Sequence, residues 1–499
     1  MTSSFRRVLL LFPILFLAVA FAGLLAHPSD FYFPYPFWEE ALKTLRRFTH
    51  VFAAIAFIFA FRRLPPLQNL FKALSRINRN QFLITILGFG FILRVVWSFY
   101  SPYQPTADGA GFMTLATHLL RENRFTSDGI TPNASAAPGY PFFLAGVYAI
   151  FGNSLFTTQI AQSVMNIAMI GFVYLATEKI FGRTTAVLAS VSLTFSLNQI
   201  LTSAMVINEH LYLLAVLPAV YLLASDLDKD SWIKLLAAGG LLGISNLARG
   251  LLLTFPPFLF FLYLFARKGW GRSFLKTGVV TLMSVAVILP WTYRNYRTFG
   301  YPVPICTSAG FGFYTMNSPI ADPYVTQLVE MESAHPEYRG LHPHPEVARY
   351  LGGSRYAREW ILSDPWRFIR LGAGKLISFY GLNSYWSIAE NSGPQDLLQT
   401  KILHKVFKKA MRYGYIFHFT LFFLGVFVLL FKYGWTRFDS KKMLILLLIY
   451  FLTGIHFLFC GQKRYRQSID PFLFMTSAFM LVYIVKRDLI TDGLSETVR

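Results

Sequence analysis

Long runs of hydrophobic residues recur along the chain, separated by short polar or basic segments. A helix needs roughly 20 apolar residues to cross a hydrocarbon core of about 30 Å. Runs that approach this length predict spans near 8–26, 48–61, 82–100, 155–178, 184–200, 206–224, 232–248, 250–266, 277–293, 413–432, 443–460 and 468–485. The runs are continuous rather than alternating, which favours helices over a barrel. The pattern predicts an all-α polytopic membrane protein with about twelve spans.

Composition agrees with a membrane setting. Of the 499 residues, 54% are hydrophobic, 51 are Phe and only 14% are charged, which excludes the balance of a soluble protein. A net charge of +21 would suggest a nucleic-acid partner in a soluble protein. Here the Lys and Arg residues sort by loop instead, which is the pattern of membrane orientation. We therefore expect membrane lipids, and not nucleic acid, as partners.

Basic residues occupy every second connection between the predicted spans. With a cytoplasmic N-terminus, the basic connections are Arg62 to Arg79, Lys179 to Arg183, Arg267 to Lys276, Lys432 to Lys442, and Lys486 with Arg487. By the positive-inside rule, both termini should be cytoplasmic. The loops at 27–47, 101–154, 201–205, 294–412 and 461–467 should then face outward. We expect the run at 8–26 to be a retained anchor, because it lacks a clear small-residue cleavage site.

The first long outer loop, 101–154, carries a candidate catalytic carboxylate. Asp108 follows Tyr100, the end of the preceding span, by eight residues. At that distance a reacting group could meet a lipid-borne substrate. Thr106 to Gly109 is also a plausible helix start, in which Asp108 would only cap the helix.

Two clusters of cations depart from the orientation rule. The outer connection after the eleventh predicted span carries Lys463, Arg464 and Arg466, and the exit of the ninth span carries Arg294 and Arg297. Interfacial anchoring would explain either cluster alone. Two clusters at one face, beside a loop that carries a carboxylate, favour an anion site such as the phosphate of a lipid carrier.

Ionisable residues also occur at the ends of apolar runs. Asn208, Glu209 and His210 begin the sixth span, and Arg249 lies between the seventh and eighth. Such residues are costly in lipid and tend to sit at helix mouths or face a wet cavity. Topology places both groups near the outer face. Alternatively, Glu209 only interacts with a helix dipole, and Arg249 with Gly250 marks a hairpin turn.

The cysteines and the clustered histidines indicate little chemistry. Cys306 and Cys460 both fall near the outer face, so a disulfide is possible but not required. The His residues between 335 and 344 are interleaved with prolines and lack a helical His pair, which favours a surface loop over a metal site.

Four short stretches resemble a known family when taken in order. They are Arg94 with Asp108, Phe112, Ala116 and Leu119; 137–142 (Ala-Pro-Gly-Tyr-Pro-Phe) with Phe151-Gly152; 290–295 (Pro-Trp-Thr-Tyr-Arg-Asn) with Phe299-Gly300; and 464–466 (Arg-Tyr-Arg) with Asp470-Pro471-Phe472. The chain from about 82 to 486 thereby resembles the polytopic glycosyltransferases of the GT-C fold. The likeness is to the protein O-mannosyltransferase and aminoarabinose transferase superfamily and its bacterial glycosyltransferase family 39 relatives.

The resemblance implies a polyprenyl-phosphate sugar as donor and an inverting transfer on the extracytoplasmic face of a bacterial inner membrane. Asp108 matches the family's first-loop aspartate, which would act as base. Glu209 matches a second acidic position that supports the site or binds a divalent metal ion, in which Asp108 would share. The residues expected to bind substrate or phosphate are Arg94, Tyr140, Arg249, Arg294, Arg297, Lys463, Arg464, Tyr465 and Arg466.

Two departures narrow the activity that the resemblance implies. Eukaryotic-type mannosyltransferases have an Asp-Glu pair where this chain has Asp108-Gly109, and aminoarabinose transferases have Lys where it has Ala137. Neither protein mannosylation nor aminoarabinose transfer is therefore expected, and the acceptor stays open between lipid, glycan and protein. A flippase would need binding groups at mid-membrane and broken helices in paired halves. A polymerase or ligase of surface polysaccharide remains a third possibility.

Four segments follow from these observations. Residues 1–80 should form extra N-terminal spans and a basic cytoplasmic loop, and 81–293 the GT-C core with the outer loop 101–154. Residues 294–412 should form an extracytoplasmic segment, and 413–499 the last transmembrane helices.

Overall fold

The fold is described by a computed structural model that covers residues 50–101, 103–322, 331–381, 401–436 and 438–492. The predicted span at 8–26 lies outside the described residues. The helices are α3 (Pro65–Arg76), α4 (Arg79–Tyr100), α5 (Asp108–Glu122), α6 (Gly139–Phe151), α7 (Leu155–Phe181), α8 (Arg183–Thr194), α9 (Leu197–Thr202), α10 (Glu209–Asp228), α11 (Trp232–Ala248), η2 (Gly250–Leu252), η3 (Pro256–Phe258), α12 (Leu259–Phe265), α13 (Trp270–Phe299), α14 (Ser308–Met316), α15 (Met331–Ala334), η4 (Pro336–Leu341), α16 (Pro345–Ser363), α17 (Pro365–Phe379), α19 (Lys401–Val428), η5 (Leu429–Thr436), α20 (Ser440–Leu458), η6 (Lys463–Ser468) and α21 (Asp470–Asp492).

The predicted all-α architecture is confirmed, but the count of twelve spans is not. Within the described residues, six helices are long and apolar enough to cross a membrane: α4, α7, α10, α13, Lys409–Gly434 and α20. A bent pair, His50–Ala60 with Pro65–Arg76, would make a seventh. The apolar helices α6, α11 and Pro256–Phe265 are shorter. Length and composition alone therefore support a multi-pass membrane protein.

Two predicted spans are broken. The run at 184–200 forms α8 and the separate short helix α9, which begins at Leu197. The run at 250–266 forms two 3₁₀ turns and the seven-residue helix α12. The second break coincides with Pro256 and Pro257, which lack the N–H that a helix interior requires. The prediction of one continuous helix from apolar composition is therefore wrong for both segments.

The central helix of the bundle is α10, which contributes Tyr212, Val216 and Val220 to the main hydrophobic core between α7, α8, α11, α20 and α21. Next to it, α11 packs very closely on α13. A Cβ atom on Gly239 would lie 2.7 Å from the Val280 carbonyl oxygen. Small residues of this kind let membrane helices approach to backbone distance. The closely packed bundle provides a rigid support for the helix ends on which the candidate site lies.

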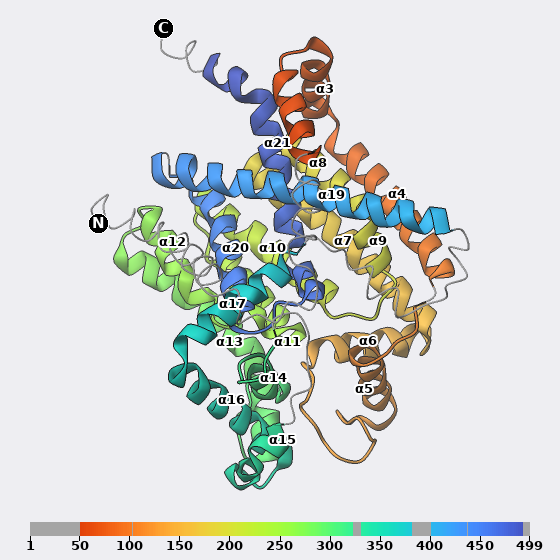
Figure 1. Ribbon diagram of the computed structural model, residues 1–499, viewed down its shortest axis with the longest axis vertical. Helices are drawn as coiled ribbons and strands as arrows, with labels where there is room; N and C mark the ends of the chain where they lie inside the picture. The colour runs from red at the N-terminus through yellow and green to blue at the C-terminus, as the bar shows by residue number, and fades with distance from the viewer. Residues whose placement is uncertain (1–49, 102, 323–330, 382–400, 437, 493–499) are drawn as a thin grey trace.

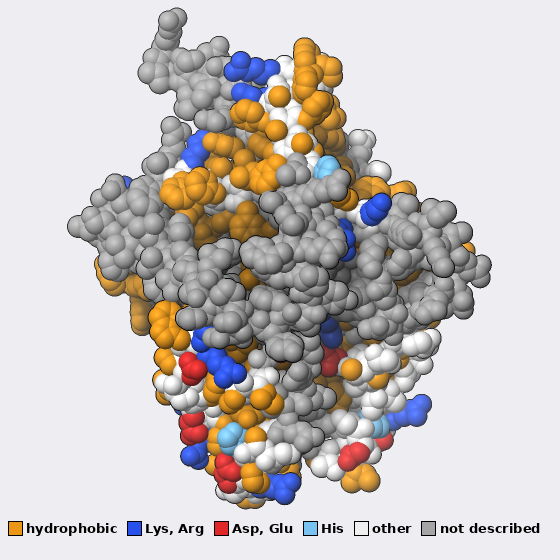
Figure 2. Space-filling model, in the orientation of Figure 1, with side chains coloured by type: hydrophobic (Ala, Val, Ile, Leu, Met, Phe, Trp, Pro, Cys, Tyr) orange, Lys and Arg blue, Asp and Glu red, His pale blue; other side chains and the backbone are white. Residues whose placement is uncertain are grey.

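A layer of shorter helices covers one end of the bundle. Figure 1 shows α5 and α6 beside α14, α15 and α16 at the lower end, while α3 and the last turns of α21 lie at the opposite end. Charged and other polar side chains gather at the lower end in Figure 2, and hydrophobic side chains are prominent among the coloured residues near the upper end. These shorter helices come from the loops that the charge pattern predicts to face outward.

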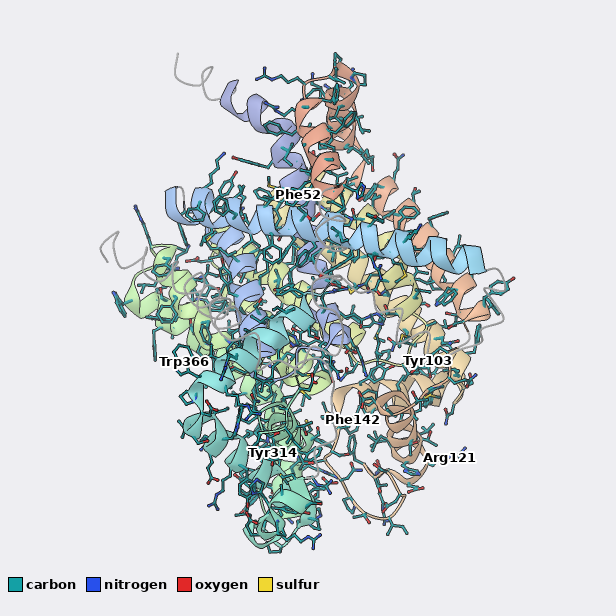
Figure 3. The ribbon with its side chains drawn as sticks, viewed as in Figure 1. Phe52, Tyr103, Arg121, Phe142, Tyr314 and Trp366 are labelled. Carbon is teal, nitrogen blue, oxygen red and sulfur yellow. The ribbon has the colours of Figure 1, made fainter. Side chains whose placement is uncertain are left out.

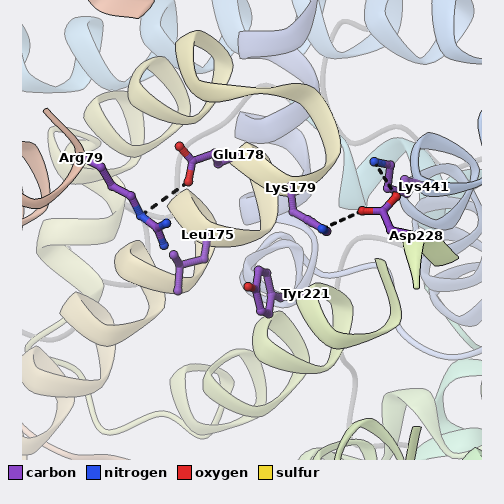
Figure 4. Close-up of a pocket in the computed structure, with 7 residues that line it drawn as sticks. All are labelled: Arg79, Leu175, Glu178, Lys179, Tyr221, Asp228 and Lys441. Atoms are coloured by element: carbon purple, nitrogen blue, oxygen red, sulfur yellow. Dashed lines mark ion pairs between the residues drawn. The ribbon is translucent and has the colours of Figure 1, made fainter. Parts of the chain in front are cut away.

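Ion pairs connect four helices at a cavity of about 270 Å³ on the predicted cytoplasmic side. Arg79 of α4 lies 3.6 Å from Glu178 of α7. Asp228 of α10 pairs with Lys179 of α7 at 2.6 Å and with Lys441 of α20 at 2.9 Å. Figure 4 shows these pairs around the cavity. The carboxylates thus cross-link the ends of α4, α7, α10 and α20.

Candidate active site

Asp108 is the first residue of α5, and its carboxylate pairs with a cation that lies far from it in the sequence. The position that would cap the helix is taken by Ala107, which gives no side-chain hydrogen bond and adopts φ +45°. Oδ2 of Asp108 instead lies 3.0 Å from Nη1 of Arg464. Its side chain is 56% exposed. The carboxylate is therefore accessible and held by an ion pair, and it is not the helix cap that the sequence also allowed.

The glycine after Asp108 lies where the packing leaves little room for a side chain. A Cβ atom on Gly109 would lie 2.6 Å from the Tyr103 hydroxyl and 3.2 Å from the Val206 carbonyl oxygen. Figure 3 labels Tyr103 at the upper edge of the lower layer, where α4 gives way to α5 and α6. A glutamate at this position, as in the eukaryotic-type pair, would require the Tyr103 hydroxyl to move away and a small shift at Val206. The glycine of Asp108-Gly109 thus suits the close packing at this place.

Glu209 lies beneath this ion pair at the start of α10. It is fully buried, and its Oε1 lies 2.5 Å from Arg249 Nη1 and 3.5 Å from Arg464 Nε. Its Oε2 is buried with no hydrogen-bond partner among the described residues. Arg464 therefore bridges the buried carboxylate of Glu209 and the exposed carboxylate of Asp108. Burial alone would lower the pKa of Arg464, but attraction by the two carboxylates raises it above its usual value.

Arg249 is placed by the end of α11 and by a neighbouring aromatic ring. It follows the last residue of that helix, and its Nη1 also donates to Asn208 Oδ1 at 3.3 Å. Asn208 in turn donates to the Ala248 carbonyl oxygen at 2.9 Å. The guanidinium lies 4.4 Å above the ring of Tyr465, at cation–π distance. Two arginines and two carboxylates thus form one compact, charge-balanced cluster.

The structure brings five of the predicted site residues into this cluster: Asp108, Glu209, Arg249, Arg464 and Tyr465. Four chain segments supply them: the start of α5, the start of α10, the residue after α11 and the 3₁₀ turn η6. Within this cluster only Asp108 is more than half exposed. A substrate entering from the surface would meet its carboxylate first.

Arg94 and Tyr140 lie instead in a buried polar network between helices. Arg94 Nε donates to Asn166 Oδ1 at 2.5 Å, and Asn166 Nδ2 contacts His210 Nε2 at 3.2 Å. His210 Nδ1 contacts Gln162 Oε1 at 2.9 Å, and Gln162 Nε2 donates to the Tyr140 hydroxyl at 2.6 Å. Arg94 and Tyr140 are both fully buried. The network reaches the residue next to Glu209, so it supports the site from inside the bundle.

Arg294 docks the outer loop onto the end of α13. Its Nη1 donates to the Asn133 carbonyl oxygen at 2.8 Å, and its guanidinium lies 4.8 Å from the Trp291 ring. Asn295 donates to the Val303 carbonyl oxygen at 2.9 Å. The polar residues of this motif therefore bind backbone oxygens in the structure. A phosphate-binding role for Arg294 stays a prediction.

The remaining basic candidates differ in exposure. Arg297 is exposed, and its Nη1 contacts the Tyr293 hydroxyl at 3.4 Å. Arg466 is buried, donates to the Gly381 carbonyl oxygen at 2.8 Å and lies over the Tyr415 ring. The side chain of Lys463 lies outside the described residues. Phosphate binding by these three residues also stays a prediction.

Potential metal ligands are dispersed in the part of the chain that the structure describes. Among these residues, no group of three or more His, Cys, Asp or Glu side chains lies close enough to bind an ion. Asp108 and Glu209 have Arg464 between them. A guanidinium in that place makes the pair unsuited to a shared cation. Cys306 and Cys460 are both free.

Several polar residues around the cluster were not among the residues predicted from the sequence. Gln162 and Asn166 lie four positions apart in an apolar run, so their shared helix face was a readable signal. Asn317 and Lys375, which bond to each other at 2.8 Å near η6, gave no such signal. Tyr103 gave none either, because its role depends on the space left by Gly109.

Comparison with known proteins gives one family match and several solved structures of similar fold. Residues 135–293 match the model of a family described as dolichyl-phosphate-mannose-protein mannosyltransferase. The search of curated proteins found no match. The apo oligosaccharyltransferase of Archaeoglobus fulgidus is 14% identical, with a TM-score of 0.50, over 84% of this chain and 52% of the archaeal chain. The chain therefore spans about half the length of that protein.

Two ligand-bound structures show weaker similarity. The Archaeoglobus fulgidus enzyme AglB, in complex with an inhibitory peptide and a dolichol-phosphate, is 13% identical with a TM-score of 0.47, over 84% of this chain and 52% of AglB. ArnT from Cupriavidus metallidurans, bound to undecaprenyl phosphate, is 13% identical with a TM-score of 0.38, over 76% of this chain and 77% of ArnT. The family match over residues 135–293 and the shared fold confirm the predicted resemblance to the GT-C glycosyltransferases.

Proposed function

We propose that this protein is an inverting glycosyltransferase that moves a sugar from a polyprenyl phosphate to an acceptor hydroxyl at the predicted outer face. The observation that carries the proposal is the cluster in which Arg464 bridges the exposed Asp108 and the buried Glu209. The matching family model describes enzymes that use a dolichyl-phosphate sugar. A lipid-phosphate donor is therefore the substrate class that best fits an outer-face cluster of arginines and carboxylates.

The chemistry follows from the position of Asp108. The acceptor oxygen attacks the anomeric carbon while the bond between that carbon and the phosphate oxygen breaks. The acceptor proton passes to the Asp108 carboxylate, and the polyprenyl phosphate leaves with the bonding electrons. A single displacement of this kind inverts the anomeric centre. A positioned base typically contributes about 10²- to 10⁴-fold to such a step.

The cations explain how the leaving group is stabilised. Charge develops on the departing phosphate, and fixed cations at that place lower the barrier. Arg464 is the cation that lies between the surface and the buried Glu209. When a donor phosphate binds Arg464, it weakens the ion pair with Asp108 and frees that carboxylate for the acceptor. Arg249 remains paired with Glu209 and keeps the buried charge neutralised.

No step of this scheme uses a metal ion. The two carboxylates that could bind one are instead bridged by a guanidinium. The Archaeoglobus fulgidus oligosaccharyltransferase has also been crystallised as a complex with Zn and sulfate, which is a property of that protein. A metal ion at Asp108 and Glu209, which the resemblance gives as one possible role of these residues, would have to displace Arg464.

The test compares Asp108→Asn with the parent protein. Purified protein is incubated with polyprenyl-phosphate sugars and candidate acceptors, and the release of polyprenyl phosphate is measured. We expect turnover to fall about 10²- to 10⁴-fold, because the base is lost. Intact donor after incubation of the parent protein would indicate a flippase. Undiminished turnover in a folded Asp108→Asn variant would remove Asp108 from the mechanism.

Asp128 provides a matched control in the same outer loop. Its Oδ1 accepts hydrogen bonds from the Thr126 hydroxyl at 2.7 Å and from the backbone N–H groups of Ile130 and Thr131 at 2.9 and 2.7 Å. These bonds lower the pKa of the carboxyl group. Asparagine keeps an acceptor oxygen at the same place. Asp128→Asn should therefore leave turnover nearly unchanged.

A further inference from the structure

A lysine on α17 is buried, and its hydrogen-bond partners among the described residues include no carboxylate. Lys375 is fully buried, and its Nζ donates to Asn317 Oδ1 at 2.8 Å. The same ammonium lies 3.3 Å from the Leu458 carbonyl oxygen and 3.5 Å from that of Phe457. All three acceptors are neutral oxygens.

The other fully buried lysine of the described chain shows what is unusual here. Lys276 is equally buried, but it pairs with Asp226 at 2.6 Å and with Asp230 at 3.0 Å. A buried charge is costly unless it is paired and hydrogen-bonded. An apolar side chain of similar length would avoid that cost at position 375. Stability alone therefore gives no reason for a lysine in this place.

The contacts of Lys375 lie at the end of α20. The last carbonyl groups of a helix have no partner within the helix, and a cation near them is favourable. Leu458 is the last residue of α20, and its carbonyl oxygen accepts from both Lys375 and Asn317. Lys375 thus fixes the point at which the chain leaves α20.

The chain then turns directly against α17. A Cβ atom on Gly461 would collide with the carbonyl oxygen of Lys375, so the turn touches the backbone of that helix. On the other side of the turn, His456 contacts the Cys460 carbonyl oxygen at 2.7 Å and Ser468 Oγ at 3.3 Å. The turn at 459–462 is therefore clamped at both ends.

The next element along the chain is η6, which carries Arg464 and Tyr465. Arg464 reaches the carboxylates of Asp108 and Glu209, and Tyr465 lies under Arg249. Only a few residues separate these two side chains from the clamped turn. Any shift of the turn would displace the guanidinium that bridges the two carboxylates.

We propose that Lys375 is a positioning residue for Arg464: its bonds to Asn317 and to the end of α20 fix the turn from which η6 directs Arg464 into the cluster. This inference rests on the proposed function for its effect on turnover, although not for its effect on structure. Burial lowers the pKa of Lys375 to about 7. Near neutral pH the ammonium of Lys375 is therefore close to losing its proton, and with it the charge that strengthens its hydrogen bonds.

The test uses Lys375→Met in the full-length protein, with Lys409→Met, an exposed lysine of α19, as control. The kcat/KM for the polyprenyl-phosphate donor should fall roughly tenfold or more, because a misplacement of about 1 Å can cost up to 10²-fold in rate. The loss should appear in kcat as well as in KM, since Arg464 both binds the donor phosphate and stabilises it as it leaves. In an Arg464→Met background, Lys375→Met should add little further, since both changes remove the same contact. An unchanged kcat/KM, or fully independent effects of the two substitutions, would overturn the proposal.

Amide hydrogen exchange without substrate separates this inference from the proposed function. Lys375→Met should accelerate exchange in residues 459–468 and leave the outer loop at 125–134 unchanged, whereas Lys409→Met should change neither. Gly461→Ala is a second variant that keeps the lysine but moves the turn, and it should reproduce the faster exchange. A parent protein without turnover would end the proposed function only. Unchanged exchange at 459–468 in both variants would end the positioning role.

Discussion

Glu209→Gln should destabilise the protein and uncouple the two arginines of the cluster. The change keeps the shape of the side chain but removes the buried negative charge. Glu209 Oε1 lies 2.5 Å from Arg249 and 3.5 Å from Arg464. In the variant, both guanidinium groups lose a charged partner at the inner side of the cluster. Arg464 then has only Asp108 as a carboxylate partner there.

The expected magnitude follows from burial. Loss of one partner of a buried ion pair typically costs about 3–5 kcal/mol, because the other charge is left uncompensated. The side chains of Arg249 and Arg464 are 15% and 22% exposed, so water can recover part of that loss. We therefore expect the lower end of the range, about 3 kcal/mol. Glu359 is 55% exposed and pairs with Arg355 at 2.8 Å. Glu359→Gln should therefore lower the free energy of unfolding by less than about 1 kcal/mol.

The assay is thermal unfolding in detergent of Glu209→Gln, Arg249→Met and the double variant. Each single change leaves a charge behind, whereas the double change removes both. The double variant should therefore be more stable than the sum of the single effects, with a coupling energy of about 1.5 kcal/mol or more. Simple additivity, or a Glu209→Gln variant as stable as the parent, would refute the inference that Glu209 holds the cluster together.

Three further predictions follow from single features. Ala107→Gly should stabilise the protein by about 1 kcal/mol in thermal unfolding, because glycine adopts φ +45° without the strain of alanine. Arg294→Met should accelerate amide exchange at 125–134, which includes Asn133, because the loop loses its bond to α13. The unfolded chain keeps the Lys375 proton up to a pKa of 10.5, whereas the folded protein releases it near 7. The stability of the parent relative to Lys375→Met should therefore rise with pH between these values, by roughly 1.4 kcal/mol per pH unit.

The class of the fold was predictable from hydrophobic length alone. In lipid, every backbone group must be satisfied within its own helix, so long apolar runs leave few other structures. The run predicted at 155–178 is α7, Leu155–Phe181, and that predicted at 232–248 is α11. The same reasoning failed where composition and backbone requirements disagree. Pro256 and Pro257 are apolar, yet they end any continuous helix through that segment.

The site was predictable as a set of residues but not as an arrangement. Unfavourable charges at helix mouths singled out Glu209 and Arg249, which the structure joins at 2.5 Å. Asp108 and Arg464 lie 356 positions apart, and nothing in a single sequence indicates that they meet. The clamp at Lys375 was hidden for a different reason. A lysine in an amphipathic outer helix is expected to face solvent, and only the structure shows that Lys375 is buried.

The outer arginines show why residue type alone could not assign their roles. Arg294 and Arg466 have the same chemistry as Arg464, but both donate to backbone carbonyl oxygens, and Arg466 also lies 3.6 Å from the buried carboxylate of Asp470. Arg464 is shared between two carboxylates, of which Asp108 is exposed. An incoming phosphate can compete for a guanidinium held by an exposed carboxylate more readily than for one that satisfies buried carbonyl groups. Among these three arginines, Arg464 is therefore the one whose bonds a donor could exchange without unfolding the site.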